Sequence, residues 1–392
     1  MNQPSTDADR QPAKLRVLRL YHSGVVGPWR ERDRALAREG VAVTLVAPRR
    51  WNEGGDDVLL EPAADEHVVA AGTIGRHPYR FAYDPRPLWR VLRSGPFDVI
   101  DIHEEPASLA TAEILLLARL AGQRAPVCLY CAQNIEKRYP IPFRWFERIA
   151  LGRARAVHTC NDAAGEILRR KGFDGIVENL GLGVDLDHFA PAAIHDPPTN
   201  PPTGPPAVRA DVNRRCRVGY VGRLEVHKGV AELINAVAGL PDVQLDIVGA
   251  GPERDALARQ VERLGCRDRI TFEGFRPSDQ IAQLYATFDL VAVPSLDTPG
   301  WIEQFGRVAV EAMASGVPVI ASDSGSLAEV VGDAGILVPP DDQAALAVAI
   351  DRLARSADER LALASRARQR AERWSWPAIA RRQAALYRQM TA

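Results

Sequence analysis

Residues 15–47 read LRVLRLYHSGVVGPWRERDRALAREGVAVTLVA. The apolar-rich run 15–21 is typical of a strand, and a glycine-containing loop follows at 22–28. Residues 29–39 have the composition of a helix, and 41–47 are again typical of a strand. A strand, a glycine loop, a helix and a strand in this order open a parallel α/β unit. The N-terminal half is therefore predicted to be an α/β domain.

The rest of this half continues the alternation. Strands are predicted at 99–102, 127–132 and 156–160, and helices between them at 107–120 and 142–151. This order favours a doubly wound parallel sheet with helices on both faces.

A proline-rich segment at 191–210 follows. Proline neither donates to a sheet ladder nor continues a helix, so we expect an extended linker between two domains, 1–190 and 211–375. After it the alternation starts again, with elements expected at 217–222, 230–238, 243–248, 256–264, 270–272, 281–285, 290–293, 307–314 and 317–321, and helix from 343 to the end. Two such domains place a ligand cleft between the carboxyl ends of their strands.

Composition excludes several classes of protein. The chain has 392 residues and a net charge of −1, which argues against a protein that holds nucleic acid by bulk electrostatics. The N-terminus lacks the apolar core of a secretory signal, and the apolar stretch 107–121 is too short to span a bilayer. Five irregularly spaced cysteines indicate a reducing compartment, so a cytoplasmic protein is expected. Cys128 and Cys131 form a C-x-x-C pattern with no second pair for zinc, and are predicted to be buried strand residues.

The most informative motif is EQFGRVAVEAMASGVPVI at residues 303–320. Glu303 is expected in a loop after a strand, and Gly306 at the start of a helix whose first amides favour an anion. Glu311 falls inside that helix on a largely apolar segment, where its carboxylate needs hydrogen-bond donors such as sugar hydroxyls. Taken alone, the two glutamates also fit a loop carboxylate and a solvent-facing helix residue.

Two further motifs carry polar groups at strand ends. In VGRLEVHKG at 221–229, Arg223 and Lys228 leave one loop five residues apart, a placement that suits a diphosphate. A pair of solvated basic residues is the alternative there. In VIDIHEEP at 99–106, His103 emerges from the end of a buried strand and is a candidate to line the cleft, although a lone histidine is often structural.

Together these motifs resemble the retaining glycosyltransferases of family 4. That family has the GT-B fold, in which two Rossmann-like α/β domains face each other across a cleft. The resemblance covers nearly the whole chain and rests on His103 with Pro106, GVDLDHF at 183–189, Gly222-Arg223 to Lys228-Gly229, the E-x7-E pair Glu303 and Glu311, and ASGVPVI at 314–320. It also implies that a last helix, at about 376–392, returns to the first domain.

The resemblance implies a nucleotide-sugar donor site in the second domain. Glu311 would bind the ribose hydroxyls, and Glu303 the hydroxyls of the transferred sugar. The donor diphosphate would be held by Arg223, Lys228, Gly222 and the segment Phe305, Gly306, Arg307 and Val308.

The first domain would complete the site. His103 would line the sugar pocket, and Gly24 would let the first loop approach the phosphates. By this resemblance the catalytic residues are His103, Arg223, Lys228 and Glu303.

The implied reaction moves a hexose-type sugar, with retention, from a UDP- or GDP-type donor to a glycan, lipid-linked or small-molecule acceptor, in cell-surface polysaccharide or glycoconjugate synthesis. No Asp-x-Asp motif sits in a convincing place, so neither a metal nor another cofactor is expected. The first loop, SGVVGPWR at 23–30, lacks the family's paired glycines, and Leu182 stands where many members have asparagine. The acceptor is therefore not implied.

Other functions stay open at this point. They are a GT-B-fold phosphorylase or nucleotide-sugar epimerase, and a non-catalytic nucleotide-sugar-binding protein. Peripheral contact with the inner face of the membrane is a separate question, because residues 138–155 mix arginines and aromatic residues around an expected helix. The alternative is an amphipathic helix that packs Trp145 and Phe146 on its own sheet.

Overall fold

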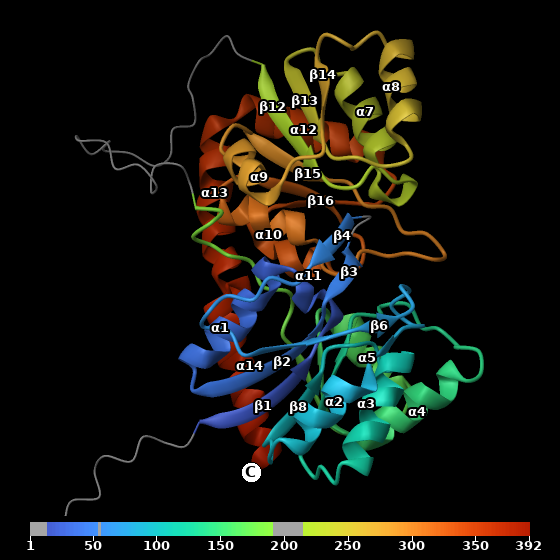
Figure 1. Cartoon of the computed structure of the whole chain (residues 1–392). Coiled ribbons are helices and arrows are strands. Elements are labelled where there is room, and N and C mark those ends of the chain that lie inside the picture. Colours follow the sequence, from blue (N-terminus) through green and yellow to red (C-terminus); the bar gives the residue numbers. More distant parts are fainter. Residues whose placement is uncertain (1–13, 54–55, 191–214) are drawn as a thin grey trace, which may run out of the picture.

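A computed structural model describes residues 14–53, 56–190 and 215–392 (Figure 1). It has two α/β domains, each built around a parallel sheet, which confirms the predicted fold class. The linker expected at 191–210 lies outside the described residues.

The first sheet has seven parallel strands in the order β11-β10-β9-β8-β1-β2-β5. These strands are β1 (Leu15–Leu20), β2 (Val41–Pro48), β5 (Val68–Ala71), β8 (Val99–Ile102), β9 (Val127–Cys131), β10 (Ala154–Thr159) and β11 (Ile176–Asn179). Helices α1 (Glu31–Arg38), α2 (Pro85–Arg93), α3 (Leu109–Leu120), α4 (Phe143–Arg153) and α5 (Asp162–Arg170) connect them. Strand order reverses at β1, which lies between β2 and β8, and ligands bind at such a switch point in open α/β sheets.

The second sheet has six strands in the order β14-β13-β12-β15-β16-β17. These are β12 (Cys216–Val221), β13 (Val243–Val248), β14 (Ile270–Gly274), β15 (Leu290–Val293), β16 (Val319–Ser322) and β17 (Ile336–Val338). The helices are α7 (Val230–Ala238), α8 (Arg254–Arg263), α9 (Ser278–Tyr285), α10 (Arg307–Ala314), α11 (Leu327–Val331), α12 (Gln343–Arg355) and α13 (Ala357–Ala371).

The segment after β1 differs from the expected helix at 29–39. It forms two 3-10 turns, η1 (His22–Val25) and η2 (Gly27–Arg30), and α1 begins only at Glu31. Pro28 lies in the second turn, and the Arg30 side chain donates back to the carbonyl groups of Gly24 and Val25. These contacts hold the segment in short turns instead of a continuous helix.

After α13 the chain crosses back to the first domain, where α14 (Trp376–Thr391) packs against α1 (Figure 1). Two glycines allow a close approach at this crossing. A methyl group on Gly181 would lie 2.3 Å from the Trp374 ring, and one on Gly183 would lie 2.0 Å from the Trp376 ring. Only glycine fits at such distances, so the crossing is fixed by these two pairs.

The exposed side chains of α4 do not fit the alternative in which this helix packs Trp145 and Phe146 on its own sheet. Trp145 and Ile149 are 55% and 56% exposed, and the buried residue of the helix is Ala150. The expectation that Trp145 packs on its own sheet is therefore wrong, whereas Phe146 is half-buried. No helix in the described part of the chain is long and apolar enough to cross a membrane.

Candidate active site

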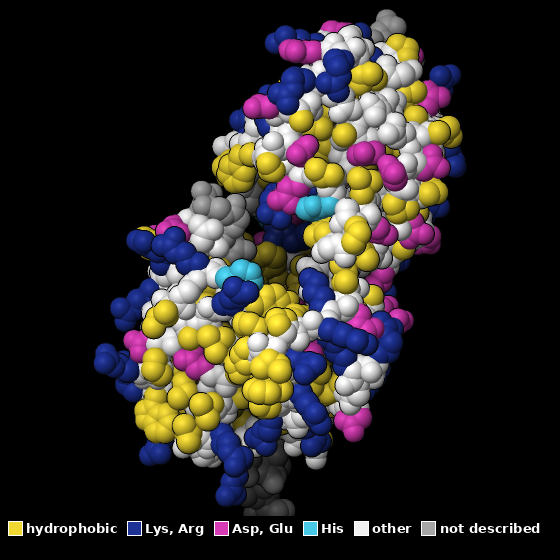
Figure 2. All heavy atoms as spheres, turned by 90° about the vertical axis from the view of Figure 1, so that its right-hand side faces the viewer, with side chains coloured by type: hydrophobic (Ala, Val, Ile, Leu, Met, Phe, Trp, Pro, Cys, Tyr) yellow, Lys and Arg dark blue, Asp and Glu magenta, His cyan; other side chains and the backbone are white. Residues whose placement is uncertain are grey.

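The two domains enclose a hollow, which Figure 2 shows from the side. Glu303, in the loop after β15, contributes a side chain that is only 12% exposed. Its Oε2 accepts hydrogen bonds from Lys228 Nζ at 2.8 Å and from Ser295 Oγ at 3.1 Å. The same ammonium group lies 4.3 Å from the centre of the Trp301 ring. Lys228 and Glu303, predicted from separate motifs, are thus in direct contact.

A tight turn places Lys228. Gly229 has a φ of +67°, and a Cβ atom there would lie 1.8 Å from the carbonyl oxygen of Pro294. Only glycine permits this backbone contact between the two loops.

The Arg223 side chain is not part of the contact between Lys228 and Glu303. Its side chain is 65% exposed and pairs with Glu225 at 3.0 Å. Of the two predicted diphosphate ligands, the structure therefore brings Lys228 to Glu303 and leaves Arg223 at the surface.

Glu311 is not the solvent-facing residue of the alternative interpretation. Its side chain is 7% exposed, and its two oxygens accept hydrogen bonds from Arg307 Nε at 3.0 Å and Tyr285 Oη at 3.1 Å. The Arg307 guanidinium also lies 4.6 Å from the Trp29 ring of the first domain. A cavity of about 490 Å³ opens beside these groups, lined by Trp29, Gly183, Ser278, Arg307 and Glu311 among others.

The start of α10 separates the two glutamates. Gly306 has a φ of +79°, and a Cβ atom there would lie 2.3 Å from Leu327 Cδ2. The first helical amides, at Arg307 and Val308, have no partner within the helix and favour an anion in front of them. Phe305 is buried and meets the Trp374 ring edge-on at 5.2 Å.

First-domain side chains hold this loop from the other side. Asn134 Nδ2 donates to the carbonyl of Glu303 at 2.9 Å, and Asn161 Nδ2 donates to that of Gln304 at 2.9 Å. Sequence reasoning missed both residues. Asparagine is a preferred helix N-cap residue, and Asn161 caps α5 by accepting a hydrogen bond from the Ala164 amide at 2.7 Å. Nothing in the sequence indicated its second contact, with the carbonyl of Gln304.

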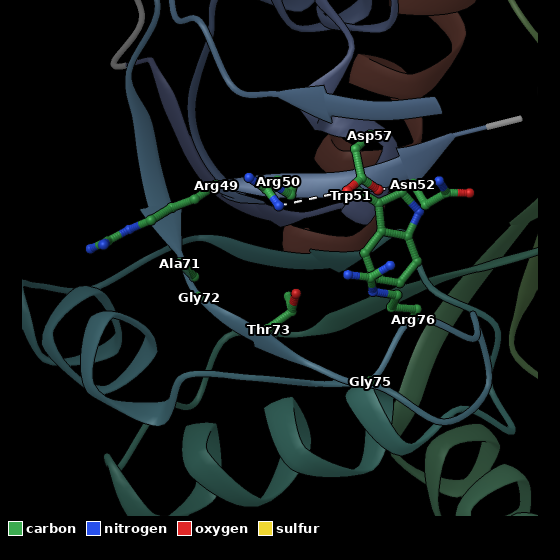
Figure 3. A pocket seen from close by; sticks show the side chains of 10 residues that line it. All are labelled: Arg49, Arg50, Trp51, Asn52, Asp57, Ala71, Gly72, Thr73, Gly75 and Arg76. Atoms are coloured by element: carbon green, nitrogen blue, oxygen red, sulfur yellow. Dashed lines mark hydrogen bonds and ion pairs between the residues drawn. The ribbon is translucent and has the colours of Figure 1, made fainter. Parts of the chain in front are cut away.

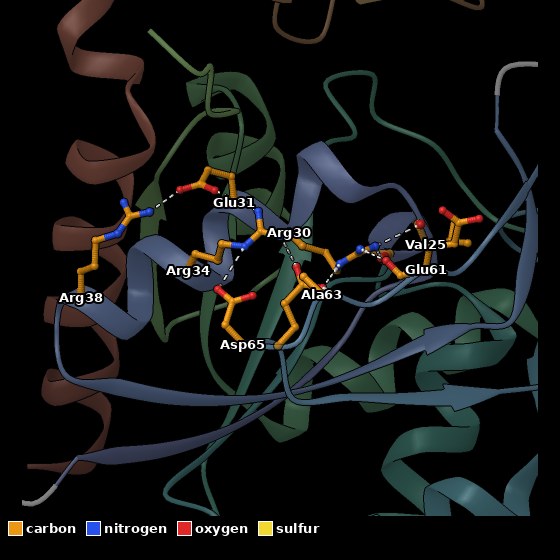
Figure 4. A network of polar contacts seen from close by, with 10 residues as sticks. Val25, Arg30, Glu31, Arg34, Arg38, Glu61, Ala63 and Asp65 are labelled. Atoms are coloured by element: carbon orange, nitrogen blue, oxygen red, sulfur yellow. Dashed lines mark hydrogen bonds and ion pairs between the residues drawn. The ribbon is translucent and has the colours of Figure 1, made fainter. Parts of the chain in front are cut away.

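The first loop is built around Arg30 (Figure 4). Its guanidinium donates to the carbonyl groups of Gly24 at 3.0 Å, Val25 at 3.1 Å and Glu61 at 2.7 Å. Gly24 is buried, and a Cβ atom there would lie 3.2 Å from Leu45. Arg30 thus fixes the first loop, which the resemblance places near the donor phosphates.

His103 lies at the end of β8 and is almost fully buried. Its ring stacks on Tyr130 at 4.0 Å with an interplanar angle of 8°, and its Nδ1 lies 3.3 Å from Arg19 Nη2. Burial, together with the charges of Arg19 and Arg32, holds the pKa of His103 well below its usual value. The imidazole is therefore neutral at pH 7.

A smaller cavity of about 270 Å³ lies at the carboxyl ends of β2 and β5 (Figure 3). Arg50, Trp51, Thr73 and Arg76 are among its lining residues, and Arg50 pairs with Asp57 at 3.6 Å. Trp51 packs on the His22 ring at 4.8 Å, which places this cavity near the first loop.

The C-x-x-C prediction is confirmed. Cys128 and Cys131 are free and buried in β9, and burial raises the pKa of both thiols.

Both domains match families of known proteins. Residues 211–370 match the model of glycosyl transferases group 1, and residues 30–177 match that of the glycosyl transferase 4-like domain. Each of the two domains belongs to the glycosyltransferase family whose model it matches. The E-x7-E pair is a feature of this sequence that the matches do not address.

Individual curated relatives match only part of this chain. A D-inositol 3-phosphate glycosyltransferase of Corynebacterium urealyticum is 37% identical over 44% of the chain, and the match spans 43% of that relative's length. A 2-deoxystreptamine glucosyltransferase of Streptomyces kanamyceticus is 28% identical over 67% of the chain and 70% of its own length.

Solved structures confirm the GT-B fold. A sucrose-phosphate synthase from Thermosynechococcus elongatus superposes with a TM-score of 0.69 at 23% identity, over 96% of this chain and 99% of its own. The Anabaena protein HepE, solved with UDP and glucose, gives 0.66 at 23% identity over 96% of this chain and 100% of its own.

We expect Tyr285→Phe to weaken nucleoside diphosphate binding about two- to tenfold, because Glu311 loses one of the two donors that orient its carboxylate, an effect on the scale of one hydrogen bond of about 0.5–1.5 kcal/mol. The phenylalanine ring fills the same space, so the melting temperature should change little. Calorimetric titration with UDP and GDP measures the effect. Tyr139→Phe, in the first domain, is the matched control, and equal affinities of the Tyr285→Phe variant and the parent would contradict a ribose site at Glu311.

Proposed function

We propose that the protein transfers a sugar from a nucleotide-sugar donor to an acceptor, with the donor held by the second domain. The observation that carries this proposal is the arrangement around the start of α10. Glu303 with Lys228 lies before the helix, at an N–O distance of 2.8 Å, and Glu311 with Arg307 lies within it, at 3.0 Å. A diphosphate between them would meet cations and free amides, with a carboxylate for sugar hydroxyls at each end.

The proposed mechanism is transfer with retention of the anomeric configuration. Negative charge develops on the departing diphosphate, where Lys228, Arg223 and the first amides of α10 stabilise it. The departing phosphate oxygen then takes the acceptor's proton on the same face of the sugar. His103 and Glu303 bind the transferred sugar.

We propose a UDP- or GDP-hexose as the donor, and the complex of the HepE structure with UDP and glucose supports the UDP type. The relatives' names, which specify inositol 3-phosphate and 2-deoxystreptamine, support a small polar acceptor. An acceptor screen would compare such small molecules with the alternative acceptors, which are the glycans and lipid-linked sugars of cell-surface synthesis.

We expect Lys228→Ala to lower kcat by about 100-fold or more, because removal of one group that stabilises transition-state charge costs roughly 3–4 kcal/mol. Lys171→Ala is the matched control, since Lys171 also pairs with a glutamate, Glu147, but in the first domain. Release of nucleoside diphosphate from a donor panel measures the rate. A Lys228→Ala variant as fast as the control would contradict the assignment.

The same assay separates the alternative functions. A transferase releases nucleoside diphosphate when acceptor is added, whereas a phosphorylase requires inorganic phosphate and an epimerase releases none. A binding protein would hold the donor without even slow hydrolysis.

We propose that no divalent cation is required, since Lys228, Arg223 and the α10 amides supply the positive charge. Turnover in excess EDTA is expected to equal turnover without it. A loss of rate that manganese restores would contradict this.

A second proposal concerns peripheral contact of α3 and α4 with an anionic membrane. Leu116 and Leu120 of α3 are exposed, as are Trp145 and Ile149 of α4, and Arg144 and Arg148 lie exposed beside them. In Figure 2 the lower domain shows apolar patches bordered by basic side chains on the side of the molecule where α4 lies.

The chain is expected to co-sediment with vesicles that contain phosphatidylglycerol. Replacing Trp145 and Ile149 by alanine should lower the partition at least tenfold, because burial of each such side chain contributes about 1.5–3 kcal/mol. Leu264→Ala, an exposed apolar position of the second domain, is the control. Equal partition with neutral and anionic vesicles would dispose of the proposal.

A further inference from the structure

Arg19 is a fully buried cation in β1. Its Nε donates to Asp101 Oδ2 at 3.2 Å, its Nη1 donates to Asp33, and its Nη2 lies 3.3 Å from His103 Nδ1. Burial alone would lower the pKa of Arg19, but Asp33 and Asp101 more than offset this effect and raise it. The group facing the histidine is therefore a permanent cation.

A guanidinium group can donate hydrogen bonds and cannot accept them. The ring atom that faces it, Nδ1 of His103, must then be the acceptor. We infer that Arg19 fixes His103 as the neutral tautomer with its proton on Nε2, and that the C-terminal helix keeps Arg19 in place through Asp101. Arg19 is thus a positioning residue that acts on the sugar site through His103.

The Nε2 atom of His103 is left for a ligand. It makes no hydrogen bond to any of the described residues, and stacking on Tyr130 fixes the plane of the ring. Its N–H can donate to an oxygen of the donor sugar. This use of the proton rests on the proposed function, whereas the position of the proton does not.

The surroundings oppose a second proton on the ring. The ionisable groups around His103 come from six strands or helices and the first loop: Arg19, Arg32, Asp33, Asp101, Tyr130, His158, Tyr387 and, in the loop, Tyr21 and His22. Burial and the two arginines dominate, and they lower the pKa of His103. A neutral ring also suits glycosyl transfer, because positive charge grows on the sugar in its oxocarbenium-like transition state.

Side chains of the C-terminal helix α14 donate hydrogen bonds to the carboxylate of Asp101, which in turn accepts one from Arg19. Asp101 Oδ2 accepts hydrogen bonds from Tyr387 Oη at 2.7 Å and Gln383 Nε2 at 3.2 Å, and both side chains are fully buried. The Gln383 carbonyl oxygen in turn accepts from Arg32 Nε at 2.6 Å. The helix by which the chain returns from the second domain is therefore connected to His103 through two buried side chains.

The tautomer can be measured directly. Long-range ¹H–¹⁵N spectra of the full chain labelled with ¹⁵N-histidine distinguish a proton on Nδ1 from one on Nε2. The chain has eight histidines, and the signal lost in His103→Gln identifies the one in question. From pH 8 down to pH 6.5, the usual pKa of histidine, we expect a neutral ring with its proton on Nε2. A proton on Nδ1, or double protonation in this range, would overturn the inference, whether or not the protein proves to transfer sugar.

Two variants test the two residues behind the histidine. Arg19→Gln should introduce a loss of kcat/KM toward acid, roughly tenfold per pH unit below the new pKa of His103. Arg16→Gln, an exposed arginine of the same strand, should keep the parent profile. Tyr387→Phe removes one donor to Asp101 at constant volume and should produce exchange between the two His103 tautomers. If Arg19→Gln does not fold, this variant still decides the role of the helix, because an unchanged His103 signal would overturn it.

Discussion

The loop from Glu303 to Gly306 is held by both domains at once, and the geometry of the site depends on this. The Glu303 carbonyl accepts from Asn134 of the first domain at 2.9 Å and from the Ser326 amide of the second at 3.1 Å. Its side chain meanwhile reaches Lys228. Because Gly306 turns the chain into α10 in a left-handed conformation, a shift of the loop would displace the carboxylate and the helix amides together. The position of this loop therefore depends on both domains and not on the second domain alone.

The carboxylates of Glu303 and Glu311 each have protein partners before any ligand binds. Glu303 has an ammonium and a hydroxyl partner, and Glu311 has a guanidinium and a phenol partner. A carboxylate offers about four lone-pair directions, so about two on each remain without a partner among the described residues, where the proposed sugar hydroxyls could donate. The protein groups fix the direction of the remaining lone pairs, which is the preorganisation that a polar site needs.

The sequence predicted the parts of this site that follow from local pattern. A helix of apolar period placed Glu311 inside α10, and strand ends placed His103, Arg223 and Lys228 directly after β8 and β12. It did not predict the partners, since Tyr285 and Glu311 are 26 residues apart and Asn134 and Glu303 are 169 residues apart. Such pairs are set by the order of strands and by the approach of the domains. Among the four-residue strands, β8 and β15 are fully buried and were predicted, whereas β5 and β11, at the two edges of the first sheet, are largely half-buried and were missed.

The buried charges of the first domain require a reason other than stability. Removal of two guanidinium and two carboxylate groups from water costs several kcal/mol per ion, and apolar residues of equal volume often stabilise such a site better. Arg19 of β1 and Asp101 of β8 nevertheless form a cluster beside His103 with Arg32 and Asp33 of α1. In the donor half of the cleft, charge is placed where a diphosphate would meet it. In the first domain the charges lie behind His103, and by the proposed function its neutral ring presents one oriented hydrogen-bond donor to the sugar. The geometry favours orientation of His103, and not stabilisation of the fold, as the reason for the cluster.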